Sequence, residues 1–122
     1  MTSLLNSDSK KGEINVLALT WKTWMDFAKT ETPSFLKIDI EGGEFALLPT
    51  IKDYLSENKP IIYLSTHAPY LDANQRKEQM SRVVDVMAIY STCLNEHLER
   101  INIKELMGDD GLGHFHSYVF FD

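Results

Sequence analysis

The sequence has a single cysteine, Cys93, and therefore lacks the second thiol that an internal disulfide requires. One thiol also cannot build a cysteine-based metal cage, so a reducing, cytoplasmic location is the simplest expectation. No apolar run approaches the ~20 residues that span a bilayer. The first residues are too polar to be a signal peptide, and we expect no membrane partner.

Positive charge is also scarce, because 12 lysines and arginines face 18 aspartates and glutamates, for a net charge of -6. This balance argues against nucleic acid as a partner, since proteins that bind the phosphate backbone usually present a basic face. The 122 residues suffice for one ordinary domain. We expect a flexible lead-in over residues 1–12 and one domain over 13–122, without internal repeats.

Hydrophobic patterning predicts alternating strands and helices. The stretch at 35–40 is apolar enough for a strand buried on both faces, and Pro49 should interrupt the helix that follows it. The fold class expected is therefore α/β, with a partial doubly wound, mostly parallel sheet. Strands are expected at 14–19, 35–40, 61–64, 91–95 and 118–121, helices after Thr20, at 44–57 and at 73–90, and either a strand or a helical turn at 101–106.

The segment "FLKIDIEGGEF" gathers acids where the strand at 35–40 should end. If the backbone stays extended through Ile40, Asp39 and Glu41 project from the same side and could bind a cation. Glu44 falls in the first turn of the next helix, where the helix dipole favours its charge. A solvated, purely structural role for Glu41 and Glu44 remains open at this point.

A second candidate site follows the strand at 61–64, in "LSTHAPY". Ligands of open α/β sheets bind beyond the carboxyl ends of the strands, so His67 should lie at the same edge as Asp39. There His67 could serve as a general base or a neutral metal ligand. Tyr70 is expected to pack rather than to line a pocket.

The third candidate, "GDDGLGHFH", resembles a metal cluster in composition only. His114 and His116 share a strand face, but the glycines should keep Asp109 and Asp110 in a mobile loop that lacks the ligand pattern of a calcium loop. The glycines also precede a strand rather than a helix, so they form no dinucleotide fingerprint. We expect a solvated turn here and no metal site.

The motif then identifies a family by resemblance. "FLKIDIEGGEFALL", followed after a helix by "KPIIYLSTHAP", resembles the second half of the FkbM family of S-adenosylmethionine-dependent methyltransferases. The family hallmark, Lys-x-Asp-x-Glu-Gly-x-Glu, matches Lys37, Asp39, Glu41, Gly42 and Glu44. The resemblance implies a Rossmann-like methyltransferase fold and methyl transfer to a hydroxyl of a sugar or small metabolite.

The resemblance also implies roles for single residues. Asp39 would orient or deprotonate the acceptor, or hold a divalent metal ion that does so. Glu41 would support Asp39, and His67 would act as the base or contact the acceptor. Gly42 and Glu44 would lie on the cofactor-binding side.

In the resembled fold, a glycine-rich turn and an acid on earlier strands hold the methionine and ribose of the cofactor, and neither occurs here. The chain is therefore expected to be the C-terminal portion of the domain and inactive alone. Its open sheet edge would be covered by an N-terminal half or a partner chain. Two alternatives stay open: a non-catalytic half-domain that acts by pairing with a partner, and a Mg²⁺-dependent phosphoryl-transfer domain.

Overall fold

The computed structural model describes residues 2–6, 15–19 and 34–122, which fall into two units that we treat separately. In the first unit, β1 (Thr2–Asn6) pairs antiparallel with β2 (Asn15–Leu19), with Thr2 opposite Leu19. The strand expected at 14–19 is confirmed as β2, whereas β1 lies within the segment expected to be a flexible lead-in. The helix expected after Thr20 lies outside the described residues.

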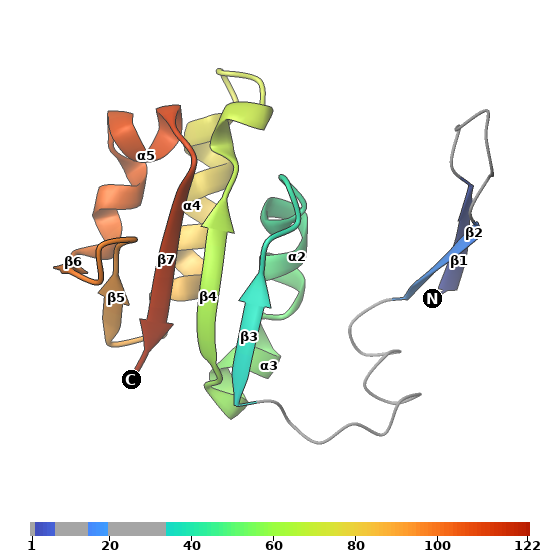
Figure 1. The fold of residues 1–122 in the computed structure, drawn as a ribbon, viewed down its shortest axis with the longest axis horizontal. Coiled ribbons are helices and arrows are strands. Elements are labelled where there is room, and N and C mark those ends of the chain that lie inside the picture. Colours follow the sequence, from blue (N-terminus) through green and yellow to red (C-terminus); the bar gives the residue numbers. More distant parts are fainter. Residues whose placement is uncertain (1, 7–14, 20–33) are drawn as a thin grey trace. The chain divides into compact units, whose positions relative to one another are not determined.

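The second unit is built on a five-stranded sheet with the order β3-β4-β7-β5-β6 (Figure 1). β3 and β4 are parallel, and both share the sheet with β7, as the sequence predicts. The expectation of a mostly parallel sheet was wrong, because β7 inserts antiparallel between β4 and β5, and β6 pairs antiparallel with β5. The strands are β3 (Phe35–Ile38), β4 (Ile61–Thr66), β5 (Thr92–Leu94), β6 (Arg100–Ile101) and β7 (His116–Phe121).

The helices lie in the predicted regions, but the helix expected at 44–57 is divided into α2 and α3. Pro49 lies inside α2 and cannot donate a hydrogen bond, and α2 ends one residue later at Thr50. Ile51 caps α2 and precedes α3, so the interruption expected at Pro49 lies two residues beyond it. The region 101–106 contains both a strand residue and a helical turn, and 73–90 contains α4. The helices are α2 (Glu44–Thr50), α3 (Lys52–Asn58), α4 (Arg76–Met87) and α5 (Asp109–Gly113), with 3₁₀ turns η1 (Ala68–Tyr70) and η2 (Ile103–Met107).

The core lies between the sheet and α4, which runs behind β4 and β7 in Figure 1. Ile62 and Leu64 alternate inward on β4 and are fully buried, as are Met80 and Val83 on α4. The expectation that β3 is buried on both faces was wrong, because Phe35 and Lys37 are exposed. The reason is that β3 is the terminal strand of the described sheet. No helix of the described residues is long and apolar enough to cross a membrane.

Candidate functional site

The acidic motif forms a tight turn between β3 and α2. The backbone of Glu41 and Gly42 takes positive φ values of 51° and 103°, and the Gly43 N–H donates to the Ile40 carbonyl at 3.1 Å. Glycine adopts such a conformation without the strain that a Cβ imposes, which explains Gly42. The turn carries the chain directly into the first residue of α2, Glu44.

Glu44 is the most enclosed charged group of the described residues, with 0% of its surface exposed. Its carboxylate accepts hydrogen bonds from the backbone N–H groups of Gly42 at 2.9 Å and His67 at 2.7 Å. Both of its oxygens also lie 3.3 Å from His67 Nδ1. A buried carboxylate is stable only when it is paired in this way. Glu44 therefore fixes the position and orientation of His67.

The structure brings Asp39 and His67 together, as their places at the ends of neighbouring parallel strands predict. His67 Nε2 lies 3.4 Å from Asp39 Oδ1, and the side chains are 12% and 47% exposed, respectively. When Nδ1–H donates to Glu44, Nε2 is left without a hydrogen in a neutral imidazole. His67 can then accept a proton at Nε2, on the side where Asp39 is open to solvent.

Glu41 does not join this pair. It is exposed on the turn, and its left-handed backbone ends the extension that would have placed it on the same side as Asp39. The expected convergence thus holds for Asp39 and His67 only. The predicted cofactor contacts of Gly42 and Glu44 remain predictions, and the contacts that the structure gives Glu44 are internal.

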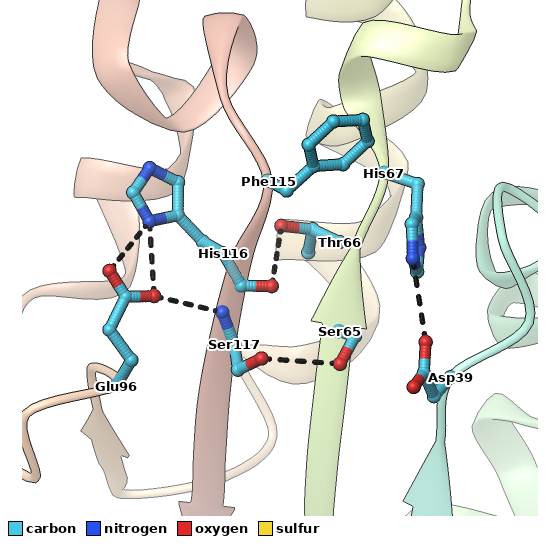
Figure 2. A pocket seen from close by; sticks show the side chains of 8 residues that line it. All are labelled: Asp39, Ser65, Thr66, His67, Glu96, Phe115, His116 and Ser117. Carbon is cyan, nitrogen blue, oxygen red and sulfur yellow. Dashed lines mark hydrogen bonds and ion pairs between the residues drawn. The ribbon is translucent and has the colours of Figure 1, made fainter.

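Asp39 and His67 line a cavity of about 180 Å³ at this edge of the sheet (Figure 2). β4 contributes Ser65 and Thr66, and the Ser65 hydroxyl lies 3.2 Å from that of Ser117 on β7. The complete lining comprises Asp39, Ser65, Thr66, His67, Glu96, Phe115, His116 and Ser117. Hydroxyl, carboxylate and imidazole groups thus surround one small space.

The model of the methyltransferase FkbM domain matches residues 2–102, which include the turn, Glu44 and His67. The chain belongs to the FkbM family. Searches of curated proteins and of solved structures found no match. Membership indicates methyltransferase activity, and the residues at 109–116 lie beyond the matched part of this FkbM domain.

Glu96, Phe115 and Ser117 were missed as pocket residues in the sequence analysis, and His116 was considered only within the glycine-rich candidate. Phe115, His116 and Ser117 reach the pocket because β7 is antiparallel, so that its first residues meet the last residues of β4. Glu96 follows β5 and accepts a hydrogen bond from the Ser117 N–H at 3.0 Å. No local sequence signal indicates the antiparallel direction of β7, which places these residues beside His67.

Aromatic rings flank His67 at the mouth of the pocket. Tyr70 stacks on the imidazole with ring centroids 5.7 Å apart, and Phe115 meets it edge-on at 5.8 Å. Both aromatic side chains are exposed. Tyr70 packs on His67 and Phe115, as expected, and is not among the residues that line the pocket. These rings give the FkbM domain an apolar rim beside its polar pocket.

The glycine-rich third candidate is ordered as α5 rather than as the expected mobile loop. The cause lies at Gly111, where an added Cβ would come within 2.4 Å of the Leu106 carbonyl oxygen. Close packing against η2 therefore requires glycine, and its presence does not mean a flexible chain. The helix places Asp110 next to the histidines that precede and begin β7.

His116 at the start of β7 lies between carboxylates. Its Nδ1 is 3.0 Å from Glu96 Oε1, and its Nε2 is 3.0 Å from Asp110 Oδ2. Burial tends to lower the pKa of His116, but the carboxylates of Glu96 and Asp110 outweigh it and the pKa is raised. The Ser117 N–H and the His116 ring in turn lower the pKa of Glu96.

Proposed function

We propose that this FkbM domain transfers a methyl group from S-adenosylmethionine to a hydroxyl group of a sugar or another small metabolite. The observation that carries the proposal is the pair of His67 Nε2 and Asp39 Oδ1, 3.4 Å apart in a polar pocket. A hydroxyl acceptor must lose one proton during methylation, and a positioned imidazole is suited to remove it.

The residues of the pocket divide the work between them. Glu44 holds Nδ1 of His67, so that Nε2 would be directed at the acceptor hydroxyl. It would take the hydroxyl proton while the methyl–sulfur bond of S-adenosylmethionine breaks and the methyl–oxygen bond forms, leaving S-adenosylhomocysteine. Asp39 orients the hydroxyl and stabilises the imidazolium that results. Tyr70 and Phe115 provide exposed rings against which the apolar face of a sugar can lie.

The cofactor fits this pocket only in part. A cavity of about 180 Å³ is smaller than the 300–1,000 Å³ typical of small-molecule sites, so it accommodates the reacting groups and not the whole cofactor. When bound, S-adenosylmethionine supplies an electrophilic methyl group on a positively charged sulfur, which suits the carboxylate of Asp39. Contacts to its methionine and ribose would come from a further segment with a glycine-rich turn.

The test uses the 122-residue chain alone and joined to such a segment. Alone, the chain should show no calorimetric binding of S-adenosylmethionine at micromolar concentrations, because several hydrogen bonds of about 1 kcal/mol each are missing. The joined protein should bind it and methylate a hydroxyl acceptor. Asp39→Asn should then abolish methyl transfer and leave cofactor binding largely intact.

The matched control is Asp53→Asn, an exposed aspartate on α3 that should retain full activity. Glu41→Gln tests the supporting role that the motif suggests for that residue. Full activity in Asp39→Asn and in His67→Gln would contradict the proposal. Micromolar binding by the chain alone would show that it contains a self-contained cofactor site.

A second candidate function rests on β3, which forms the edge of the described sheet with Phe35 exposed. An exposed edge strand can pair with another chain, so a non-catalytic domain that acts through a partner is the alternative. Lys37→Pro would remove a backbone donor that faces this edge, because the Leu36 N–H is directed at β4, and it should abolish such pairing, whereas Asp39→Asn should not affect it. Size-exclusion chromatography with light scattering distinguishes these outcomes.

A further inference from the structure

A second polar cluster lies at the same end of the sheet as the Asp39–His67 pair, where α5 meets the start of β7. Asp110 Oδ1 is 3.1 Å from His114 Nδ1, and Asp110 Oδ2 is 3.0 Å from His116 Nε2. One ligand atom from each of these residues lies within 4.8 Å of the other two. The cluster thus offers two imidazole nitrogens and one carboxylate oxygen at a common point.

The contacts of His116 point to a cation at this place. Its Nδ1 faces Glu96 at 3.0 and 3.1 Å, and its Nε2 faces both the side chain and, at 3.2 Å, the backbone carbonyl of Asp110. A neutral imidazole has one N–H and cannot donate to acceptors on both sides, so these contacts require either a second ring proton or a bound metal ion. If Nδ1–H donates to Glu96, a positive charge between Nε2 and Asp110 satisfies the remaining lone pairs.

We propose that Asp110, His114 and His116 bind a divalent zinc ion. Ligands at ~2.0–2.1 Å from a tetrahedral zinc ion lie about 3.3 Å apart, close to the Asp110 separations observed. The His114 side chain is 71% exposed and can rotate to close the remaining gap. Three protein ligands leave the fourth position for water or an added ligand.

Glu96 acts as a positioning residue for this site. Metal-bound histidines commonly donate their other ring N–H to a carboxylate, which fixes the tautomer and orients the ring. Glu96 makes this contact with His116 and is itself held by the Ser117 N–H at 3.0 Å. A cavity of about 430 Å³ lined in part by Glu96, Asp110 and His116 gives access to the ion from solvent.

The donor set also decides between metals. Imidazole nitrogens suit zinc and its transition-metal neighbours, whereas magnesium and calcium prefer oxygen ligands. The site is therefore distinct in chemistry from the divalent ion that Asp39 could hold. Because residues 110–116 lie beyond the region that matches the family model, the site is a proposal about this chain and not about the family.

Isothermal calorimetry on the EDTA-treated and dialysed 122-residue chain at pH 7.5 tests the proposal with zinc and magnesium chlorides as probes. We expect one zinc ion per chain with micromolar or tighter affinity and no magnesium binding at the same concentrations. Asp110→Asn and His114→Ala should each weaken zinc binding by at least tenfold. Both residues are exposed, so these variants should fold, as far-UV circular dichroism will check.

Matched controls are Asp109→Asn, the neighbouring acid of α5, and His97→Ala, an exposed histidine outside the cluster. Both should bind zinc like the original chain. Glu96→Gln should weaken zinc binding by about 10–100-fold without removing a ligand. Unchanged affinity in Asp110→Asn and His114→Ala, or an absence of zinc binding, would show that the cluster is only an ion-pair network.

Discussion

Two histidines at one edge of the sheet have the same kinds of neighbours but differ in the burial of those neighbours. In each, Nδ1 faces a glutamate and Nε2 faces an aspartate: Glu44 and Asp39 for His67, Glu96 and Asp110 for His116. Glu44 is completely buried, whereas the Glu96 side chain is 38% exposed. Burial therefore separates a cluster built into the core from one assembled at the surface.

This difference determines what each cluster can do. A buried glutamate keeps the His67 ring in one orientation, which suits proton transfer to a positioned acceptor. Because Glu96 is half-exposed, the His116 cluster is open to ions from solvent. The cluster also contains a second histidine, His114. The same imidazole–carboxylate chemistry thus supports a preorganised base on one strand and an accessible ligand set on another.

The largest expected effect is the loss of stability when Glu44, rather than Glu96, is replaced by alanine. Glu44→Ala leaves a buried cavity and unpaired N–H groups of Gly42 and His67, and we expect a loss of about 3–5 kcal/mol in the free energy of unfolding. Glu96→Ala removes a half-exposed acceptor and should cost about 1 kcal/mol. Urea unfolding measures both. Equal losses in the two variants would remove the distinction between a core and a surface cluster.

The parts of the site that the sequence predicts are those that depend on strand ends. Asp39 and His67 each follow one of two neighbouring parallel strands, and this placement alone brings them together. The enclosure of Glu44 was not predictable, because it depends on how the first turn of α2 packs beneath the residue after β4. The helix-dipole argument gave its position in α2 correctly but not its hydrogen bonds to His67.

The parts that could not be predicted depend on non-local strand direction. Nothing local in "HSYVFF" reveals that β7 inserts antiparallel beside β4, and so the contributions of Phe115 and Ser117 to the pocket were missed. The glycines of α5 were misjudged for a similar reason, because the requirement at Gly111 comes from the Leu106 backbone. Contacts distant in sequence decided each of these features.

An intermediate effect is expected on the reactivity of Cys93, the only thiol, when Glu96 is replaced. Burial, followed by the charge of Glu105, raises the pKa of Cys93 to about 12, so the native thiol should react slowly with an aromatic disulfide reagent at pH 8. Glu96→Ala removes the bond that ties the chain after β5 to Ser117. Labelling should become about fivefold faster, as a loss of about 1 kcal/mol implies.

The control for thiol labelling is Glu57→Ala, an exposed glutamate on α3 that should leave the labelling rate unchanged. We expect that low urea concentrations do not change the labelling rate of Glu96→Ala. Such a result would indicate that Cys93 is labelled through local opening near β5. If Glu44→Gln accelerates labelling in the absence of urea as much as Glu96→Ala does, the two clusters do not act locally.

The smallest effect is expected between the clusters, at the hydroxyl pair of Ser65 on β4 and Ser117 on β7, 3.2 Å apart. The pair is half-buried and can exchange its hydrogen bond for water, so each serine-to-alanine change should cost less than about 1 kcal/mol. A double-mutant cycle in urea should give a coupling energy of about 0.5 kcal/mol. A coupling well above 1 kcal/mol would mean that the hydroxyl pair links the His67 and His116 clusters into one network, and the comparison between two separate sites would then no longer hold.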